Sequence, residues 1–133
     1  MANWLLKTEP DCYNFSDLER DKKTIWDGVS NNLALKYLRQ MKNGDRAFIY
    51  HTGDERQVVG IADVVSDPYV DPAQNDPKLA VVDIKARKRL PRPVSLGQIK
   101  GNEKLQDFLL VKMSRLSVMP VTDEQWEIIQ TSL

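Results

Sequence analysis

The sequence is poor in the residues on which metal centres, disulfide frameworks and many hydrolases depend. Its 133 residues include one cysteine, Cys12, and one histidine, His51. A lone cysteine excludes an internal disulfide framework, and one histidine excludes a multi-histidine metal centre within one chain. Glycine-rich phosphate loops and the G-x-S-x-G motif are also absent. We therefore expect no metal, no cofactor and a reducing cytoplasmic environment.

An excess of charge of one sign and long apolar runs are missing as well. The 19 lysines and arginines balance 19 aspartates and glutamates, which argues against a protein that holds nucleic acid by bulk electrostatics. No apolar run approaches the roughly 18 residues that span a bilayer, and residues 1–11 lack the basic start of a leader. We expect a soluble, unprocessed monomer with no membrane partner, folded as a single domain over residues 1–133.

The first third of the chain combines a strand with helices. Residues 3–8 form a short apolar run that ends before a proline, which predicts a buried strand. Ser16 and Glu19 have capping-box spacing and predict a short helix that begins there. Apolar residues recur at helical spacing from 33 to 41, so we expect a helix that stops before Gly44.

The middle of the chain is rich in β-forming residues. Residues 46–52 and 57–65 flank a short glycine-containing turn and predict an antiparallel hairpin, in which Gly60 marks a bulge or a close approach. Residues 66–78 contain three Asp-Pro pairs and few apolar residues, which predicts a long loop. Residues 79–90 alternate apolar and mostly basic residues, as in a strand with one face on the core.

The last third predicts one or two strands between short helices. Ser95 with Gln98 and Thr122 with Gln125 repeat the capping-box spacing, and residues 109–121 are apolar enough for strands. The expected apolar side of the terminal helix carries Trp126, Ile129 and Leu133. With no repeats and no regular β-α alternation, we expect a mixed α/β fold: a curved, barrel-like antiparallel sheet flanked by short helices.

Trp26 stands where neither helix nor strand periodicity requires a tryptophan. The default interpretation is core packing, as we expect for Trp4 and the terminal-helix tryptophan. The functional interpretation is a platform for a planar ring, in which Ile25 anchors the segment and Gly28 lets the backbone approach a ligand. Stacking of a base on an aromatic ring is worth about 1–3 kcal/mol, and hydrogen bonds to the base edge then give selectivity. Asp27, Asn31 and nearby backbone amides are candidates for such bonds.

Two further groups of polar residues are candidates for function. Lys7, Thr8 and Glu9 bring an ammonium, a hydroxyl and a carboxylate to a strand end, where side chains can face a cleft, although a surface ion pair is the plainer explanation. A nucleophilic Cys12–His51 pair is a weak alternative because a lone cysteine usually behaves as a small hydrophobe. The second group is a basic strip, defined as Lys85, Arg87, Lys88, Arg89 and Arg92, which is either a solvated sheet face or a contact for nucleic-acid backbone.

Eight short motifs occur in the order found in the EVE domain family. They are WLLKTEP (4–10), TIWDGV (24–29), MKxGD (41–45), YHT (50–52), VGIA (59–62), DP (71–72), PVSL (93–96) and RLSVxPV (115–121). The chain therefore resembles this family over essentially its whole length. EVE domains are PUA-like and similar in fold to YTH domains, which read methylated adenine in RNA. The resemblance implies a non-catalytic module that binds a methylated or otherwise substituted cytosine or adenine in DNA or RNA.

The resemblance also implies where the base pocket lies. Its walls would be Lys7, Thr8 and Glu9; Trp26, Asp27, Gly28, Val29 and Asn31; His51 and Thr52; and Arg115 and Ser117. The family usually has arginine where this chain has Ser30 and Leu35, so two possible phosphate contacts are lost. The basic strip could compensate for that loss.

Two alternatives stay open. ASCH domains, another PUA-like family, include members that resemble amidohydrolases of acetylated cytidine and use threonine, lysine and glutamate, which would make Lys7, Thr8 and Glu9 catalytic. Strand alternation, which turns Thr8 away from its two neighbours, argues against such a site. The other alternative is a pocket for a free nucleoside or another small metabolite, which uses the same stacking and edge contacts.

Overall fold

A computed structural model describes residues 1–131 and shows seven strands and five α-helices among them. The strands are β1 (Asn3–Thr8), β2 (Lys23–Trp26), β3 (Arg46–His51), β4 (Gln57–Val64), β5 (Tyr69–Val70), β6 (Ala80–Ser95) and β7 (Val118–Val121). The helices are α1 (Phe15–Asp21), α2 (Asn32–Leu38), α3 (Leu96–Lys100), α4 (Leu109–Lys112) and α5 (Asp123–Thr131), with a 3₁₀ turn η1 (Glu103–Leu105). The mixed α/β class is confirmed. Leu133, expected on the terminal helix, lies outside the described residues.

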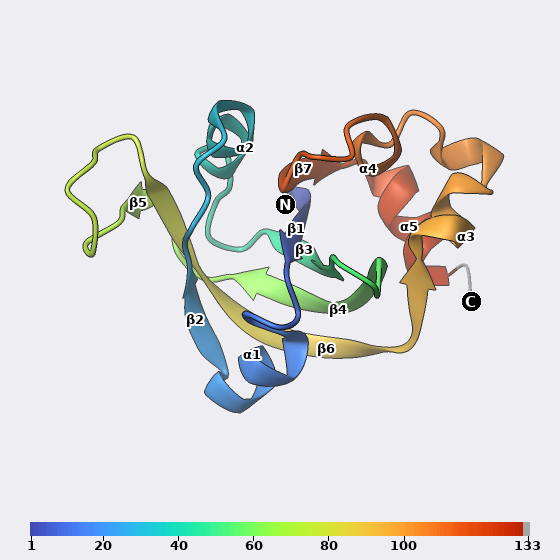
Figure 1. Ribbon diagram of the computed structural model, residues 1–133, viewed down its shortest axis with the longest axis horizontal. Coiled ribbons are helices and arrows are strands. Elements are labelled where there is room, and N and C mark those ends of the chain that lie inside the picture. The colour runs from blue at the N-terminus through green and yellow to red at the C-terminus, as the bar shows by residue number, and fades with distance from the viewer. Residues whose placement is uncertain (132–133) are drawn as a thin grey trace.

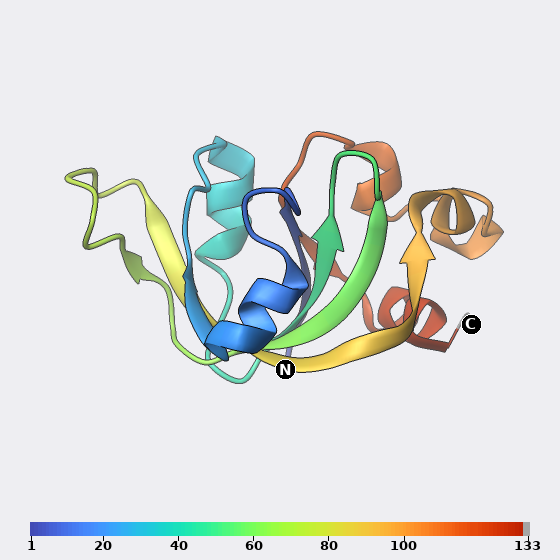
Figure 2. The same ribbon diagram turned by 60° about the horizontal axis from the view of Figure 1, so that its bottom comes forward.

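The strands form one curved sheet in the order β2-β6-β4-β3-β1-β7, with β5 paired to β6. The bent strands β4 and β6 give the sheet its curvature (Figures 1 and 2). β1 and β3 run parallel, so the expected wholly antiparallel sheet is wrong at this pair, because α1, β2 and α2 form a crossover between the two strands. Within residues 1–131 the end strands β2 and β7 do not pair, so the sheet is not a closed barrel.

Three β-segments differ from the prediction. β6 continues to Ser95 instead of ending at residue 90. The reason is that β4 pairs with β6 from its first residue to its last, which places Gln57 opposite Ser95. The expected loop 66–78 contains β5, whose Tyr69 lies opposite Val81. β2 was not expected at all, and its last residue lies opposite Val82 of β6. In Figure 1, β6 runs from the β5 hairpin on the left to the helices α3, α4 and α5 on the right.

The bounds of two helices also differ from the prediction. The capping box of α1 consists of Asn14 and Asp17, whose side chains and amides bond reciprocally at 2.8 and 2.9 Å, and not of Ser16 and Glu19. Helix α2 ends at Leu38 rather than at residue 41, because the chain tightens into 3₁₀-type bonds there. The two capping boxes expected later in the chain, at residues 95–98 and 122–125, are confirmed.

Residues 109–121 are only partly a strand. The carbonyl of Phe108 accepts bonds from the amides of Val111 and Lys112, which makes the first half the helical turn α4. Only β7 forms, and it pairs antiparallel with β1. Between them, residues 113–117 form a loop beside the end of β1.

The core contains the other two tryptophans, as expected. Trp126 is fully buried and stacks on Phe48 with ring centroids 3.7 Å apart. Trp4 is buried and donates from Nε1 to Asp45 at 2.9 Å. The expected close approach at Gly60 is confirmed, because a Cβ there would overlap the ring of Phe15. No helix within residues 1–131 is long and apolar enough to cross a membrane.

Candidate functional site

A cavity of about 290 Å³ opens where the end of β1, the turn after it, the end of β2 and the residue just before β7 meet. It is lined by Lys7, Thr8, Tyr13, Thr24, Ile25, Trp26, Asp27, Gly28, Val29 and Ser117. Its volume lies at the lower end of the ~300–1,000 Å³ typical of small-molecule sites. Seven of the twelve pocket residues implied by the sequence line it: Lys7, Thr8, Trp26, Asp27, Gly28, Val29 and Ser117.

Hydrogen bonds fix the wall that β1 contributes. The amide of Lys7 donates to the carbonyl of Ser117 at 3.0 Å, and its Nζ donates to the carbonyl of Ser114 at 2.8 Å. The Thr8 hydroxyl donates to the carbonyl of Tyr13 at 2.7 Å. Lys7 and Thr8 therefore both border the cavity, contrary to the alternation argument, because the strand ends here and the chain turns back. Glu9 is exposed and does not line the cavity.

Lys7 is a cation held in a partly desolvated position. Its Nζ lies 5.7 Å from the centroid of the Tyr50 ring, a cation–π distance. Burial lowers the pKa of Lys7 below its ordinary value, because water no longer fully solvates the charged form. The cavity therefore has a hydrogen-bond donor whose charge is easier to remove than that of a surface lysine.

The tryptophan segment is arranged differently from the expected platform. Trp26 is only 7% exposed and belongs to the hydrophobic core, whereas Ile25 is 44% exposed. The expectation that Ile25 anchors the segment is wrong, because alternation along β2 turns Ile25 outward and Trp26 inward. Trp26 borders the cavity with the small part of its surface that the core leaves free.

The backbone conformation at residue 28 favours glycine. Its φ is +77°, and a Cβ at this position would meet no atom within 4 Å. The left-handed conformation alone requires glycine here. It turns the chain so that Asp27, which is exposed, stands at the cavity border just after Trp26.

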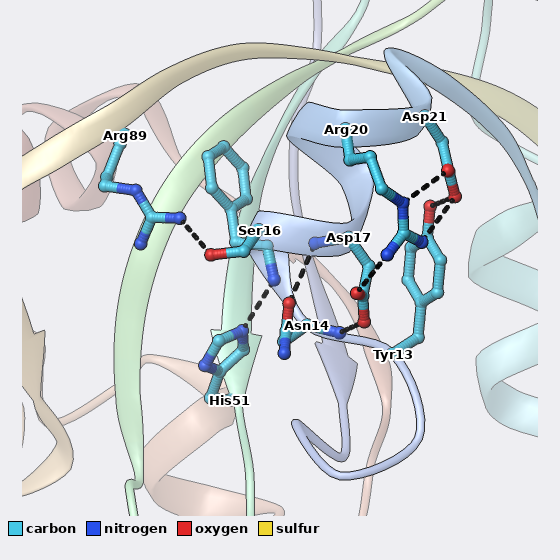
Figure 3. Close-up of polar contacts among 9 residues, drawn as sticks. Tyr13, Asn14, Ser16, Asp17, Arg20, Asp21, His51 and Arg89 are labelled. Atoms are coloured by element: carbon cyan, nitrogen blue, oxygen red, sulfur yellow. Dashed lines mark hydrogen bonds and ion pairs between the residues drawn. The ribbon is translucent and has the colours of Figure 1, made fainter.

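Tyr13 is a second aromatic residue in the cavity that the sequence reasoning missed. Its hydroxyl donates to Asp21 at 3.0 Å, and burial raises the pKa of Tyr13, which keeps the hydroxyl protonated. Figure 3 shows this bond beside the Arg20 contacts to Asp17 and Asp21. The only sequence signal was an aromatic in the turn after the strand-stopping proline, which is too common to identify a site.

His51 does not line the cavity; it joins β3 to α1. It is 5% exposed, and its Nε2 accepts a hydrogen bond from the amide of Phe15 at 3.0 Å (Figure 3). Because an amide can only donate, Nδ1 carries the proton of the neutral ring and donates to Glu55 Oε1 at 2.9 Å. Cys12 is exposed and contacts Glu9, with Sγ 3.7 Å from Oε2. Both nitrogens of His51 are thus occupied without Cys12.

The three remaining pocket candidates lie in two hollows beside the cavity. The Arg56 hollow, about 270 Å³, is lined by Lys7, Tyr50, Thr52, Gly53, Arg56, Leu96, Lys100, Leu110 and Ser114. The Arg115 hollow, about 490 Å³, is lined by Asn31, Leu33, Lys112, Met113, Ser114, Arg115 and Leu116. The side-chain oxygen of Asn31 caps α2 by accepting from two amides, of Leu33 and Ala34, at 3.0 and 3.1 Å.

The basic strip is partly neutralised within the protein. Arg87 pairs with Asp63 at 3.1 Å, and Arg89 pairs with Glu19 at 2.5 Å. Arg89 also donates to Ser16 of α1 (Figure 3). No residue of the strip lines the cavity, the Arg56 hollow or the Arg115 hollow. At position 35 the family usually has an arginine. In this chain Leu35 is buried in α2 and packs against the core.

Within the part of the chain that the structure describes, no cluster of histidine, cysteine, aspartate and glutamate could hold a metal ion. The chemical groups that border the cavity are two aromatic rings, two aliphatic side chains, an ammonium, hydroxyls and one carboxylate. Such a set can hold a planar, polar ring by its faces and edges.

Comparison with known proteins gives consistent findings. A family model for the EVE domain matches residues 2–132. Thymocyte nuclear protein 1 of Rattus norvegicus is 31% identical over 160 residues, which cover 95% of this chain and 71% of that protein. Protein Atu2648 from Agrobacterium tumefaciens is similar with a TM-score of 0.95 and 37% identity over 99% of this chain and 92% of that chain.

Two further solved structures bear on the alternatives. The human THYN1 protein in complex with 5-methylcytosine containing DNA is similar with a TM-score of 0.92 and 26% identity, over 99% of this chain and 97% of that chain. ASCH from Zymomonas mobilis has a TM-score of 0.59 and 10% identity over 95% of this chain and 92% of that chain. The second likeness is one of fold alone.

Proposed function

The chain belongs to the EVE domain family, and from that premise we propose that it binds DNA carrying 5-methylcytosine and takes the modified base into the cavity beside Trp26. The observation that carries the proposal is the set of groups in that cavity: aromatic, aliphatic, cationic and anionic side chains around a space of about 290 Å³. The family match over residues 2–132 supports one module that acts as a whole.

The lining groups complement the edges of a methylated cytosine. A carboxylate accepts a hydrogen bond from the N4 amino group of cytosine, and apolar groups contact a methyl on C5. In this cavity Asp27 supplies the carboxylate, and Ile25 and Val29 supply aliphatic surface. Lys7 and Ser117 supply donors for the acceptor atoms on the remaining edge. Tyr13 and Trp26 supply the aromatic surface, although Trp26 is mostly committed to the core.

The base must leave its stack to enter the cavity. Extrusion costs a few kcal/mol and least when the base is already unpaired. We therefore expect tighter binding to single-stranded than to duplex DNA with the same modification.

The amidohydrolase alternative has little support in the geometry. Thr8 and Lys7 border the cavity but Glu9 does not. The Thr8 hydroxyl is committed as a donor to the carbonyl of Tyr13. We expect no release of acetate when the protein is incubated with N4-acetylcytidine; formation of cytidine would make this alternative the better one.

The proposal is tested with single-stranded oligonucleotides that differ only in one central base. We expect a several-fold preference for 5-methylcytosine over cytosine, measured by fluorescence anisotropy of labelled DNA. The same assay is run with an RNA strand of the same sequence and with a DNA strand that carries N6-methyladenine. If either binds more tightly than the 5-methylcytosine strand, that nucleic acid is the better candidate ligand. If the nucleoside 5-methyl-2′-deoxycytidine binds as tightly as the oligonucleotide, the protein is instead a small-molecule binder.

Asp27→Ala identifies the base edge in the same assay. We expect a roughly 5- to 150-fold loss of affinity for the methylated strand, because a good base-edge contact is worth about 1–3 kcal/mol. Glu127→Ala is the matched control: it removes one exposed carboxylate on α5, away from the residues that line the cavity. Equal affinities for the two variants would remove Asp27 from the site.

A further inference from the structure

We propose that the DNA backbone on either side of the bound base lies over the Arg56 and Arg115 hollows, and that Arg56, Lys100, Lys112 and Arg115 contact its phosphates. This inference rests on the proposed function, because it assigns the path of the same ligand. It replaces the basic strip of β6 as the phosphate-binding surface.

The first argument is continuity. The Arg56 hollow shares Lys7 with the cavity and shares Ser114 with the Arg115 hollow. The Arg115 hollow also adjoins the cavity along the chain, since Leu116 precedes Ser117. The three depressions thus form one connected surface around the bond from Lys7 Nζ to the Ser114 carbonyl. A strand whose base enters the cavity can continue into either hollow.

The second argument is charge. Among residues 1–131, Arg56, Lys100 and Arg115 have no carboxylate within ion-pair distance, and Lys112 has only the exposed Asp107 at 3.9 Å. Arg56 uses Nε to donate to the carbonyl of Gly53 at 3.1 Å. Its terminal nitrogens have no such bond among the described residues, so the guanidinium can contact a phosphate. In the basic strip, by contrast, two arginines are paired with acids.

The third argument is the opposite charge on the other side of the cavity. A hollow of about 280 Å³ shares Asp27, Gly28 and Val29 with the cavity and contains Asp71 but no lysine or arginine. Two carboxylates without a cation repel a phosphate. The backbone is therefore directed toward the Lys7 side, where every lining residue with a full charge is cationic.

The Arg115 hollow has an apolar part as well. Leu33, Met113 and Leu116 line it, and Met113 is 41% exposed. An apolar surface bordered by Lys112 and Arg115 suits a nucleotide, whose base or sugar is less polar than its phosphate. A neighbouring nucleotide therefore fits this hollow better than a free anion does.

The test compares two triple variants of the whole chain. The path variant combines Arg56→Gln, Lys100→Gln and Arg115→Gln, and so removes charge from the proposed path. The strip variant combines Lys85→Gln, Lys88→Gln and Arg92→Gln, and removes the same charge from exposed positions of the strip that form no ion pair among the described residues. Binding to a single-stranded oligonucleotide with one 5-methylcytosine is measured across a series of salt concentrations. Circular dichroism and thermal unfolding verify that both variants fold.

We expect the path variant to lose at least tenfold in affinity at low salt and its slope of log K against log salt to fall by about 2, at ~0.7 per phosphate contact on a single strand. The strip variant should keep the wild-type slope, and 5-methyl-2′-deoxycytidine should bind both variants as it binds the wild type. A wild-type slope in the path variant, or a larger loss in the strip variant, overturns the inference while the proposed function stands. Slope loss in the path variant without any preference for the methylated base overturns the proposed function alone, and no binding by the wild type overturns both.

Discussion

The Nε2 atom of His51, at the end of β3, accepts a hydrogen bond from the amide of Phe15, the first residue of α1, at 3.0 Å. The same ring donates to Glu55 from Nδ1. The amide belongs to the first turn of a helix, where amides have no partner within the helix. One side chain thus fixes the start of α1, and with it the turn that carries Tyr13 into the cavity.

Replacing His51 tests this role as a positioning residue. We expect His51→Ala to lower the free energy of unfolding by about 2–3 kcal/mol, because it leaves the buried Phe15 amide without an acceptor. His51→Gln, which can accept the same bond, should recover most of the loss. Urea denaturation measures both variants, and an alanine variant as stable as the glutamine variant would contradict the role.

The contact between Gly60 and Phe15 gives a second stability test. A Cβ at Gly60 would overlap the buried Phe15 ring, so we expect Gly60→Ala to destabilise the protein by about 2–3 kcal/mol through overpacking. Gly97→Ala in α3 is the control, because the nearest atom to its Cβ is Ser95 Oγ at 3.8 Å. That variant should be neutral or more stable, since alanine favours helices. Similar midpoints of thermal unfolding for the two variants would count against the packing described here.

Several site residues were identifiable from the sequence only because motifs at different positions recur together. Lys7, Trp26 and Ser117 are distant in sequence, yet the β1–β3 crossover and the β1–β7 pairing bring their segments to one cavity. The family resemblance contained that information, and local periodicity did not. Local patterns did give the β3–β4 hairpin and two of the three expected capping boxes.

Some candidate residues also have a structural role in the fold. His51, Asn31 and Arg89 have side chains suited to ligand binding, but the fold uses them for bonds to the α1 amide, the α2 amides and Glu19. For His51 and Arg89 the structural partner is distant in sequence, so residue type and spacing cannot reveal it. Asn31 bonds to amides only two and three residues away, but an asparagine before a helix does not by itself distinguish a cap from a ligand contact. The parallel β1–β3 pair was not predicted, because local patterns do not show which strands pair across a long connection that contains helices.

Lys7 gives a pH-dependence with a definite sign. Burial places its folded-state pKa below the ordinary value of 10.5, so between the two values the unfolded chain binds more protons. Stability should therefore rise with pH across that alkaline window, while affinity for DNA should fall, because the ammonium is lost. Lys7→Gln should abolish this part of both trends. Urea denaturation measures the stability and fluorescence anisotropy measures the affinity, each at a series of pH values up to 10.5. A wild-type affinity that stays constant over this range would argue against a cationic contact from Lys7.

Ile25 is the best position at which to separate methyl recognition from cytosine recognition. It is 44% exposed, so truncation should cost little stability. We expect Ile25→Ala to reduce the preference for 5-methylcytosine over cytosine about three- to fivefold, since burial of one methyl-sized group is worth about 0.8 kcal/mol. Val70→Ala, exposed on β5 away from the cavity lining, should leave the preference unchanged. An unchanged preference in Ile25→Ala would place the methyl elsewhere.

The central claim is that the methylated base occupies the cavity beside Trp26. The most direct measurement is the set of intermolecular nuclear Overhauser effects from a ¹³C-labelled methyl of 5-methylcytosine in a single-stranded DNA bound to the protein. The account predicts contacts to protons of Ile25, Val29 and Trp26, all of which line the cavity. Bound DNA whose methyl shows contacts only to residues outside the cavity would contradict it.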